Sequence, residues 1–434
     1  MVNIKVKKTS KLQGQICAPP SKSYTQRMLI AAALSDGIGK VSNPLLSEDT
    51  QATYRAITAL GAKVKTAEDC WTVQGANPLK AASELINVGE SGATLRFMIP
   101  IAALANGRSA FLLSSSLERR PVEPLLNSLK ELGVKAYPKQ IGEFSVIVVE
   151  GDGIAGGKTA IPGDVSSQFI SGLMFACPMA KNATEITLTT PLESKDYVKM
   201  TQEVLAQHQI KIEINDDFQC ISIPSNQTYK QTNSKVPGDF SSAAFLLAAA
   251  AITNSKVKIN NLDYMSAQGD KAILGILKQM GVNGKVCKDS IEIEGAGDLL
   301  KAVDVDAKNN PDLVPVCATL ACYADGSSKI YNASRLRFKE SNRLASVYAE
   351  LTKMGAQIEM DENSLTIKGP CLLHGAIIDS HNDHRIAMAC AVAALGANGE
   401  TTIENAQCVR KSYPLFFTDL NSIGADIVGG KLVR

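Results

Sequence analysis

Hydrophobic residues fall into a helical pattern that recurs along the whole chain. Six alanine-rich segments are apolar on every face, and each ends at a glycine or asparagine: Gly37, Gly107, Asn182, Asn254, Gly326 and Gly399. A helix that is apolar all round has no face for solvent, so it must be buried on every side. The six ends are 70, 75, 72, 72 and 73 residues apart. This spacing predicts six repeats of about 72 residues.

A second, amphipathic helix follows in each repeat and ends in an L-x-x-x-G signature, as in "LKELGVKAY". The turn falls at Gly61, Gly133, Gly281, Gly355 and Gly424, and Gln209 takes the place in the third repeat. Short alternating segments such as "SVIVVE", "EITLTT" and "SIEIEG" predict β-strands between the helices. Each repeat therefore combines one buried helix, one surface helix and several strands.

The repeats divide into two groups of three. The polar stretch "PSNQTYKQTNSKVPGD" at 224–239 separates the third repeat from the fourth and is typical of a linker. A chain of 434 residues also exceeds one ordinary domain. We therefore predict an α/β fold of two domains, each with three repeats whose apolar helices lie inside.

Composition narrows the class of protein. Hydrophobic residues make up 45% of the chain but aromatic residues only 5%, so aliphatic side chains must build the cores. A net charge of +2 gives no sequence-wide case for binding nucleic acid or an anionic membrane. The ten cysteines form no CxxC pair, and no apolar run approaches a membrane span or a signal peptide. We expect a cytoplasmic protein.

Known cofactor signatures are missing from the sequence. It has no GxxxxGK[ST] loop, and its four histidines show no zinc-ligand spacing with cysteine. His381 and His384 are three residues apart but lack a third ligand partner. We therefore expect no metal and no cofactor, and we interpret His384 as a helix cap or a hydrogen-bonding member of a site.

Cations stand where the buried helices begin. Lys22, Arg27, Arg96 and Arg385 lie in or near the first turns of apolar helices, beside serines and glycines. A helix N-terminus already carries roughly half a positive charge, so cations are unfavourable there unless an anion offsets them. Exposed backbone N–H groups at such termini also bind anions. The pattern indicates an anionic ligand.

Several polar residues at these helix starts allow a simpler interpretation. Capping accounts for Asp164, Asp239, Ser241 and Ser242, since these residue types are preferred caps. For two carboxylates the alternatives are even: Asp312 could cap its helix, and Glu340 could form an ion pair with neighbouring cations.

Further cations recur at the boundaries of elements. They are Arg119 and Arg120 in "SSSLERRPVEPL", Lys339 and Arg343 in "RLRFKESNRL", and Lys411 in "CVRKSYPLFF". Lys339 and Arg343 are four residues apart, which predicts that they share one helical face with Glu340 beside them. We expect these cations in one cleft between the halves, where Asp312 and Glu340 could perform acid–base work.

Eight segments, in chain order, resemble the 5-enolpyruvylshikimate-3-phosphate synthase family. They are "PPSKSYTQRMLIAAAL", "GESGATLRF", "RRPVEPLL", "PGDVSSQFISGLM", "NPDLVP", "FKESNRL", "NDHRIAMA" and "RKSYPLFF". The family's fold has two domains, each with pseudo-threefold βαβαββ units, called an inside-out α/β barrel. The resemblance implies one domain of residues 21–228, a second of 1–20 with 229–434, and an active site in the cleft between them.

The resemblance also implies a reaction in the shikimate pathway. The enolpyruvyl group of phosphoenolpyruvate would pass to the 5-hydroxyl of shikimate 3-phosphate, with release of phosphate, by addition and elimination through a tetrahedral intermediate. By the same resemblance Asp312 is the base, Glu340 exchanges the proton at the methylene carbon, and Lys22 is a third catalytic residue. We expect a monomer whose partners are these two small molecules.

The resemblance assigns binding residues position by position. Shikimate 3-phosphate would be held by Lys22, Ser23, Arg27, Ser166, Ser167, Gln168, Ser194, Asp312 and Lys339. Phosphoenolpyruvate would be held by Lys22, Gly92, Arg120, Gln168, Arg343, Arg385 and Lys411.

Two alternatives stay open, and one motif departs from the family. The sister enzymes that act on a UDP-amino sugar carry Lys-Asn where this chain has Lys22-Ser23, and a cysteine that the "SLERRP" loop lacks. A non-catalytic scaffold for an anionic metabolite would share the same repeats. Where the family reads G-N-[AS]-G-T, this chain has Glu90 and Ala93. A carboxylate at position 90 would repel phosphoenolpyruvate unless it pairs with a cation.

Overall fold

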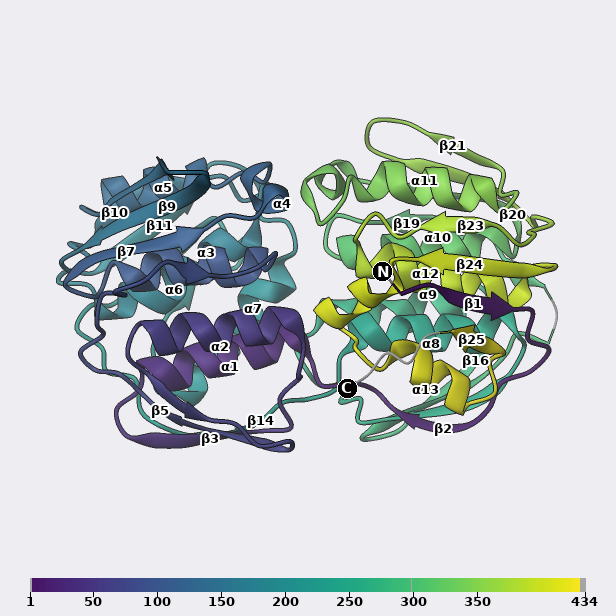
Figure 1. Ribbon diagram of the computed structural model, residues 1–434, viewed down its shortest axis with the longest axis horizontal. Coiled ribbons are helices and arrows are strands. Elements are labelled where there is room, and N and C mark those ends of the chain that lie inside the picture. Colours follow the sequence, from purple (N-terminus) through teal and green to yellow (C-terminus); the bar gives the residue numbers. More distant parts are fainter. Residues whose placement is uncertain (1, 298, 430–434) are drawn as a thin grey trace. The chain divides into compact units, whose positions relative to one another are not determined.

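The chain folds into two compact units. The computed structural model describes residues 2–297 and 299–429 (Figure 1). One unit is Ser21–Val236, and the other joins the N-terminal segment ending at Pro20 to the chain from Pro237 onward. The division lies eight residues beyond the predicted 228, because strand β14 (Asn233–Lys235) pairs in parallel with β3 (Ile38–Ser42) of the first unit.

The first unit has three buried helices and three amphipathic ones. The buried helices are α1 (Lys22–Leu34), α3 (Gly92–Ala102) and α6 (Ser167–Ala176). The amphipathic helices are α2 (Glu48–Ala59), α5 (Glu123–Glu131) and α7 (Lys195–Gln207). Two short turns, α4 (Ser115–Glu118) and η1 (Cys177–Met179), complete the set. The predicted division into buried and surface helices is confirmed.

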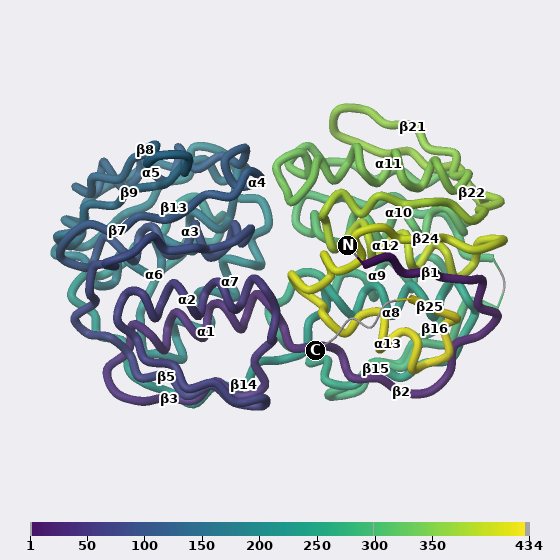
Figure 2. Tube along the Cα trace, in the orientation of Figure 1, coloured from purple at the N-terminus to yellow at the C-terminus, as the bar shows by residue number. Residues whose placement is uncertain are grey.

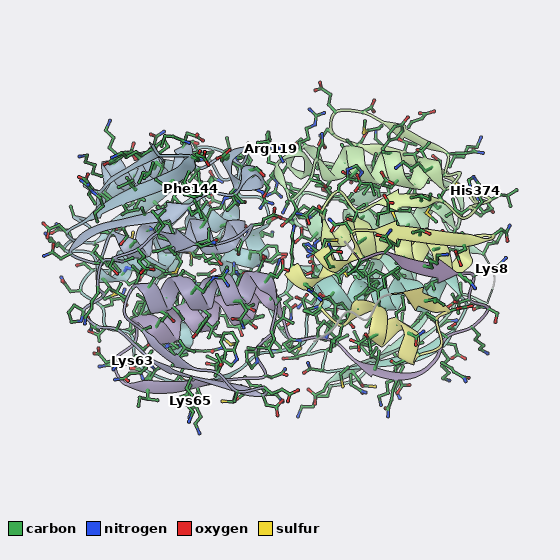
Figure 3. The ribbon with its side chains drawn as sticks, viewed as in Figure 1. Lys8, Lys63, Lys65, Arg119, Phe144 and His374 are labelled. Atoms are coloured by element: carbon green, nitrogen blue, oxygen red, sulfur yellow. The ribbon has the colours of Figure 1, made fainter. Side chains whose placement is uncertain are left out.

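Three four-stranded sheets surround these helices, with one common order. They are β14-β3-β5-β4, β6-β7-β9-β8 and β10-β11-β13-β12, and in each the first pair is parallel and the others antiparallel. Besides β14 and β3, the strands are β4 (Lys63–Lys65), β5 (Cys70–Gln74), β6 (Ile86–Asn87), β7 (Gly107–Leu112), β8 (Lys135–Ile141), β9 (Phe144–Gly151), β10 (Gly157–Ile161), β11 (Thr184–Leu188), β12 (Glu213–Ile214) and β13 (Cys220–Ile223). Lys63 and Lys65, two residues apart on β4, both project to solvent (Figure 3).

The second unit repeats this plan. Its buried helices are α8 (Phe240–Ile252), α10 (Val314–Cys322) and α12 (His384–Gly396), and its amphipathic helices are α9 (Ile273–Gln279), α11 (Arg343–Lys353) and α13 (Phe416–Ser422). Four 3₁₀ turns precede or follow them: η2 (Gly269–Ala272), η3 (Pro311–Leu313), η4 (Ser334–Phe338) and η5 (Ala406–Lys411). Phe240 to Ala251 are all buried, as the apolar pattern of this helix requires.

The N-terminal segment supplies two strands to the sheets of the second unit. These sheets are β16-β17-β15-β2, β18-β20-β22-β21 with β19 also on β20, and β23-β24-β1-β25. Their strands are β1 (Ile4–Lys7), β2 (Gln13–Cys17), β15 (Lys256–Asn260), β16 (Asn283–Val286), β17 (Ser290–Glu294), β18 (Leu300–Lys301), β19 (Val305–Asp306), β20 (Ala324–Tyr331), β21 (Ile358–Met360), β22 (Leu365–Gly369), β23 (Ile377–Asp379), β24 (Glu400–Glu404) and β25 (Ile427–Gly429). Ile4 on β1 lies opposite Ile403 on one side and Gly429 on the other (Figure 2).

The turn after each amphipathic helix has one backbone conformation. Its φ angle is 106° at Gly61, 82° at Gly133, 62° at Gln209, 90° at Gly281, 96° at Gly355 and 105° at Gly424. This left-handed region is costly for residues with a Cβ, which explains the glycines. Gln209 therefore occupies the turn position that the repeat assigned to it.

Within residues 2–297 and 299–429, no helix is both long enough and apolar enough to cross a membrane.

Candidate functional site

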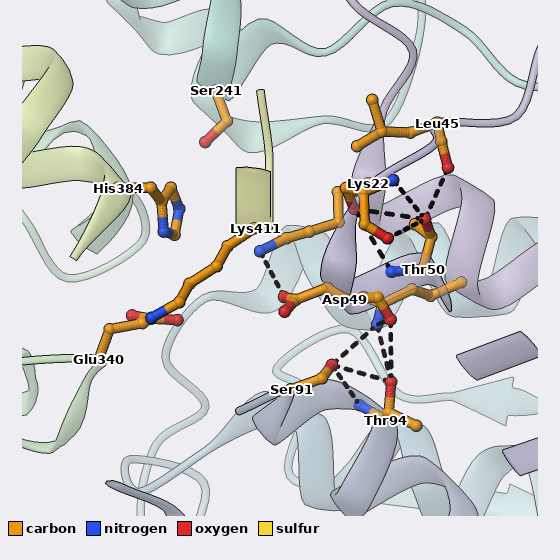
Figure 4. Close-up of polar contacts among 12 residues, drawn as sticks. Lys22, Leu45, Asp49, Thr50, Ser91, Thr94, Ser241, Glu340, His384 and Lys411 are labelled. Carbon is orange, nitrogen blue, oxygen red and sulfur yellow. Dashed lines mark hydrogen bonds and ion pairs between the residues drawn. The ribbon is translucent and has the colours of Figure 1, made fainter. Parts of the chain in front are cut away.

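The lysine at the start of α1 forms an ion pair. Ser21 caps this helix by accepting a bond from the Tyr24 N–H, so the helix begins at Lys22. The Lys22 Nζ lies 2.9 Å from Oδ2 of Asp49, in the first turn of α2 (Figure 4). Both side chains are largely buried, at 15% and 11% exposed. Asp49 thus offsets the cation that the helix dipole disfavours.

Arg27 is buried and held mainly by α7. Its Nε donates to Thr201 Oγ1 at 2.8 Å, and its Nη2 donates to the Tyr197 carbonyl at 3.1 Å. Its Nη1 donates to the carbonyl of Ser23 at 3.0 Å, and the Phe97 ring centroid lies 5.1 Å from the guanidinium carbon. Burial lowers the Arg27 pKa to about 10. Neutral protein groups therefore accept three of its N–H bonds, and none of these partners carries a negative charge.

Two guanidinium groups flank the start of α3. A Cβ on Gly92 would lie 2.7 Å from Nη1 of Arg120 and 3.7 Å from Nη1 of Arg96. Arg96 donates from Nη1 to the side-chain oxygen of Gln168 at 2.7 Å, and Ser91 caps the helix. Two cations therefore lie close to the N-terminus of α3, an arrangement that suits an anion.

The start of α6 carries the predicted serine pair. Ser166 caps the helix by accepting a bond from the Gln168 N–H at 3.3 Å, and Ser167 is its first residue. The predicted capping role of Asp164 is wrong, because its Oδ1 instead accepts a 2.7 Å bond from Thr190.

Ser194 precedes α7 in a left-handed conformation, with φ 54°. It thus lies at the start of the same helix that provides Thr201 and Tyr197 to Arg27.

In the second unit, Asp312 is the centre of a charged cluster. It lies in η3, just before α10, and its side chain is 17% exposed. Arg343 Nη1 is 2.9 Å and Lys339 Nζ 3.5 Å from Oδ1, while Arg385 Nη2 is 3.2 Å from Oδ2. Burial alone would raise the Asp312 pKa, but Arg385, Lys339 and Arg343 together hold it well below its usual value. Asp312 is therefore ionised in the free protein.

Arg343 connects three carboxylates. It is 1% exposed, and it donates to Asp312, to Asp383 Oδ2 at 2.9 Å from Nε, and to Glu340 from Nη2. Burial acts to lower the Arg343 pKa, but the charges of Asp383, Glu340 and Asp312 raise it above its usual value. This guanidinium thus fixes the relative positions of the two carboxylates predicted to be catalytic.

The predicted shared helical face of Lys339 and Arg343 is wrong. Asn342 caps α11 by accepting a bond from the Ala345 N–H, so the helix begins at Arg343. Lys339 lies before it in an extended conformation, with φ −91° and ψ −158°. The two cations still meet, but through their common contact with Asp312.

The starts of α8 and α12 also differ in part from the predictions. Asp239 caps α8 through the Ser242 N–H at 3.2 Å, as predicted. The predicted capping role of Ser241 and Ser242 is wrong, because both lie inside α8 and Asp239 is its cap; the Ser241 Oγ instead accepts a 2.7 Å bond from Arg385. Asp383 caps α12 through the Arg385 N–H at 2.9 Å, so His384, the first residue of the helix, is not the cap.

Lys411 ends η5 and is 5% exposed. Its Nζ donates to the carbonyl of Asn382 at 2.6 Å, directly before the start of α12. Figure 4 labels Lys411 together with Ser241, Glu340 and His384 of the same unit.

The sequence did not indicate a role for three carboxylates that interact with the candidate site residues: Asp49, Asp270 and Asp383. Asp49 and Asp383 stand at helix starts, where acidic residues are common and carry no special signal. Asp383 lies within the quoted "NDHRIAMA" segment, which was the one indication available.

Comparisons with known proteins point to one family. The family model described as EPSP synthase (3-phosphoshikimate 1-carboxyvinyltransferase) matches residues 6–420. A 3-phosphoshikimate 1-carboxyvinyltransferase of Methanocaldococcus jannaschii is 42% identical over 97% of this chain and 98% of its own length. One from Methanococcoides burtonii is 43% identical over 96% of this chain and 97% of its own.

Solved structures share the fold. An EPSP synthase from Acinetobacter baumannii superposes with a TM-score of 0.83 at 25% identity, covering 99% of this chain and all of its own. The enolpyruvyl transferase NikO from Streptomyces tendae superposes with a TM-score of 0.81 at 19% identity, over 99% of both chains. The α/β fold with two three-repeat domains agrees with these neighbours.

Proposed function

This chain belongs to the EPSP synthase (3-phosphoshikimate 1-carboxyvinyltransferase) family, and we propose that the residues described above carry the family's reaction. The enzyme transfers the enolpyruvyl group of phosphoenolpyruvate to shikimate 3-phosphate in the shikimate pathway. The family match and the named relatives favour this acceptor over a UDP-amino sugar.

One observation carries the assignment of roles: Lys339, Arg343 and Arg385 converge on Asp312, and Arg343 also bonds to Glu340. Each substrate brings a carboxylate and a phosphate ester, together roughly five to six negative charges at neutral pH. Each of these cations has several N–H donors, so it can bond to a substrate anion while it keeps a contact with the protein carboxylate.

For phosphoenolpyruvate we propose binding by cations and backbone groups of both units. The residues are Lys22, Gly92, Arg120, Gln168, Arg343, Arg385 and Lys411. The closeness of Arg120 to Gly92 supports this, because an anion at the start of α3 would meet both a guanidinium and the helix N-terminus. Glu90, in place of the family's amide, adds a negative charge next to this position.

For shikimate 3-phosphate we propose binding by Lys22, Ser23, Arg27, Ser166, Ser167, Gln168, Ser194, Asp312 and Lys339. The N-terminus of α6 and the serines there are suited to a phosphate, because a helix N-terminus favours negative charge and hydroxyl groups can donate to it. Arg27 keeps two of its five N–H groups beyond the three bonds given above, and these can be offered to the ligand.

The addition needs two proton transfers, and the elimination needs one proton to be removed from carbon. In the addition, the 5-hydroxyl loses its proton as its oxygen bonds to the substituted carbon of phosphoenolpyruvate, and the methylene carbon gains a proton. In the elimination, that methyl group returns a proton and phosphate departs. Asp312 is ionised and suits the base. Glu340 must carry a proton to act as donor, and a substrate anion that competes for Arg343 loosens the bond that favours its ionised form.

A phosphate-release assay tests this function. The enzyme is expected to release phosphate only when shikimate 3-phosphate and phosphoenolpyruvate are both present, and not with a UDP-amino sugar as acceptor. Saturable binding of both ligands without phosphate release would instead identify a non-catalytic scaffold.

We further propose that the enzyme works in the cytoplasm as a monomer without nucleic-acid or membrane partners. Light scattering coupled to size-exclusion chromatography would give one species at the mass of a single chain, 46.2 kDa. A stable species of twice that mass would contradict the monomer.

A further inference from the structure

Asp270 is a buried carboxylate that the proposed reaction does not use. It lies in η2 and is 4% exposed. Its Oδ1 accepts a 3.2 Å bond from the side chain of Asn310, two residues before Asp312. The hydroxyl of Ser241 also acts on this carboxylate and lowers the Asp270 pKa.

Ser241 also forms a hydrogen bond with Arg385. Its Oγ accepts the 2.7 Å bond from Arg385 Nη2, the same nitrogen that lies 3.2 Å from Oδ2 of Asp312. Arg385 Nη1 also donates to the Asp312 carbonyl at 3.2 Å. The guanidinium is thus held from two sides, by Asp312 directly and by Asp270 through one hydroxyl.

The segment that carries Asp270 is itself fastened to the start of α8. Gln268 accepts a 3.0 Å bond from the Phe240 N–H and donates at 2.8 Å to the Gly238 carbonyl. These two bonds hold the backbone on either side of Asp239. Phe240, which makes one of them, directly precedes Ser241. These contacts therefore fix the position of Ser241 relative to Asp270.

We propose that Asp270 is a positioning residue: through Ser241 and Asn310 it holds Arg385 and the Asp312 segment in place, and its negative charge keeps Arg385 from neutralising Asp312 fully. This inference rests on the proposed roles of Asp312 as base and Arg385 as a ligand of phosphoenolpyruvate. Without the charge on Asp270, Arg385 interacts more strongly with Asp312, and Asp312 becomes a weaker base.

The groups that act on Asp270 come from four elements. They are Asp312 of η3, Arg385 of α12, Ser241 of α8 and the thiol of Cys317 in α10, together with Asn310. Burial raises the Cys317 pKa to about 12, so this thiol is neutral. Burial and then the charge of Asp312 raise the Asp270 pKa to about 6, against the opposing effect of Arg385. Asp270 is therefore ionised at pH 8 and becomes increasingly protonated as the pH falls below 6.

The test compares Asp270→Asn with the wild type in the phosphate-release assay across pH 5.5–8.5. At pH 8 we expect kcat to fall by about 10- to 100-fold, the range of one hydrogen bond to a charged group. The KM for phosphoenolpyruvate should not rise, since the variant removes a negative charge near its cations. The ratio of wild-type to variant kcat should fall toward one as the pH falls below 6, where wild-type Asp270 becomes increasingly protonated. Taking the ratio cancels the ionisation of the substrates.

A matched control is Asp289→Asn, which removes an exposed carboxylate from the same unit and should leave kcat unchanged. Ser241→Ala breaks the relay, and the double variant should lose no more than the more damaging single one. A kcat ratio that stays constant with pH would show a merely structural role and overturn the proposal, as would a raised KM with unchanged kcat.

If circular dichroism shows that Asp270→Asn does not fold, the same assay on Ser241→Ala tests the proposal. A lower kcat without a higher KM supports the proposal, and wild-type kcat contradicts it. A wild-type enzyme without turnover would contradict the proposed function instead.

Discussion

Glu340 and Asp312 both bond to Arg343, yet the proposed reaction requires opposite protonation states of them. Arg343, Lys339 and Arg385 all contact Asp312 and hold its pKa well below its usual value, which suits a base. Glu340 bonds to Arg343, and it must carry a proton to act as the donor, so its role depends on a substrate anion that competes for this guanidinium.

We predict that Glu340→Gln abolishes deuterium exchange from solvent into the methylene group of phosphoenolpyruvate and lowers turnover by about 10²–10⁴-fold. Affinity for shikimate 3-phosphate, measured by calorimetry, should stay within about twofold, because Glu340 is not among its proposed ligands. Glu362→Gln, an exposed position in the same unit, is the control. Exchange at the wild-type rate in Glu340→Gln would assign the proton to another residue, most plausibly Lys22.

His208 is a buried imidazole away from the proposed chemistry. It is 1% exposed, and its Nδ1 lies 2.9 Å from the Lys230 carbonyl, to which it must donate since a carbonyl only accepts. Burial lowers the His208 pKa to about 4, against the smaller opposing effect of the bond to Lys230. His208 is therefore protonated at a lower pH in the folded protein than in the unfolded chain, where an imidazole binds a proton near pH 6.5.

Because the pKa of His208 is lower in the folded state than in the unfolded chain, the free energy of unfolding has its full value above pH 6.5 and decreases as the pH falls toward 4. We predict that His208 reduces the free energy of unfolding by about 2 kcal/mol between pH 7.5 and pH 5. Urea unfolding at both pH values should show this loss in the wild type and a smaller one in His208→Gln. Equal losses in the two proteins would rule out His208 as the cause.

Arg27 marks the limit of reading single residues from sequence. Its place near a helix start suggested an external anion, and it did not indicate Thr201 and Tyr197, which bond to Arg27 from 174 and 170 residues away in sequence. No local pattern predicts such partners. The type and charge of the site residues were predictable, while the internal bonds that hold them needed the three-dimensional structure.

At the scale of elements, the turn after each amphipathic helix offers a matched pair of substitutions. Gln209 has φ 62° and an exposed side chain, so replacing it removes no buried contact. We predict that Gln209→Gly raises the free energy of unfolding by about 0.5–1 kcal/mol, because glycine adopts this conformation without strain. Chemical denaturation would measure the gain.

The matched control is Gly281→Gln at the equivalent turn. Its φ is 90°, and no atom lies within 4 Å of an added Cβ, so only the backbone conformation is tested. It should destabilise the protein by about 1 kcal/mol. Two substitutions that change stability in the same direction would contradict this explanation of the turn.

Elements were predictable where hydrophobicity alone defines them. The six buried helices follow from apolar runs because no other environment accepts such segments. The start of α11 was not predictable from the spacing of Lys339 and Arg343, because the cap at Asn342 decides it. The boundary at 228 was misplaced for a similar reason: β14 looks like a polar linker, with Asn233 and Lys235 exposed on an edge strand.

At the scale of the whole molecule, the two units differ in the number of chain segments that form them. Ser21–Val236 is continuous and contains all the strands of its three sheets. The second unit needs the N-terminal segment, because β1 lies between β24 and β25 and β2 pairs with β15. Val6 and Leu12, both fully buried, belong to its core.

We predict that a fragment of residues 21–236 unfolds cooperatively on heating, whereas a fragment of residues 237–434 does not. Joining residues 1–20 to the end of the second fragment by a short glycine-serine linker should restore a cooperative transition, since Ile4 pairs with Gly429. Thermal unfolding followed by circular dichroism would compare the three chains. Cooperative unfolding of residues 237–434 alone would show that β1 and β2 are dispensable.

The pairing of β1 has a consequence for synthesis on the ribosome. Ile4 is made among the first residues, but its partners Ile403 and Gly429 come about 400 residues later. At about 5–20 residues per second, roughly 20–80 seconds of translation separate the strand from its sheet. The first unit can complete its fold in that interval, while the N-terminal strands wait without neighbours. The residues that leave the ribosome first are therefore among the last to find their place.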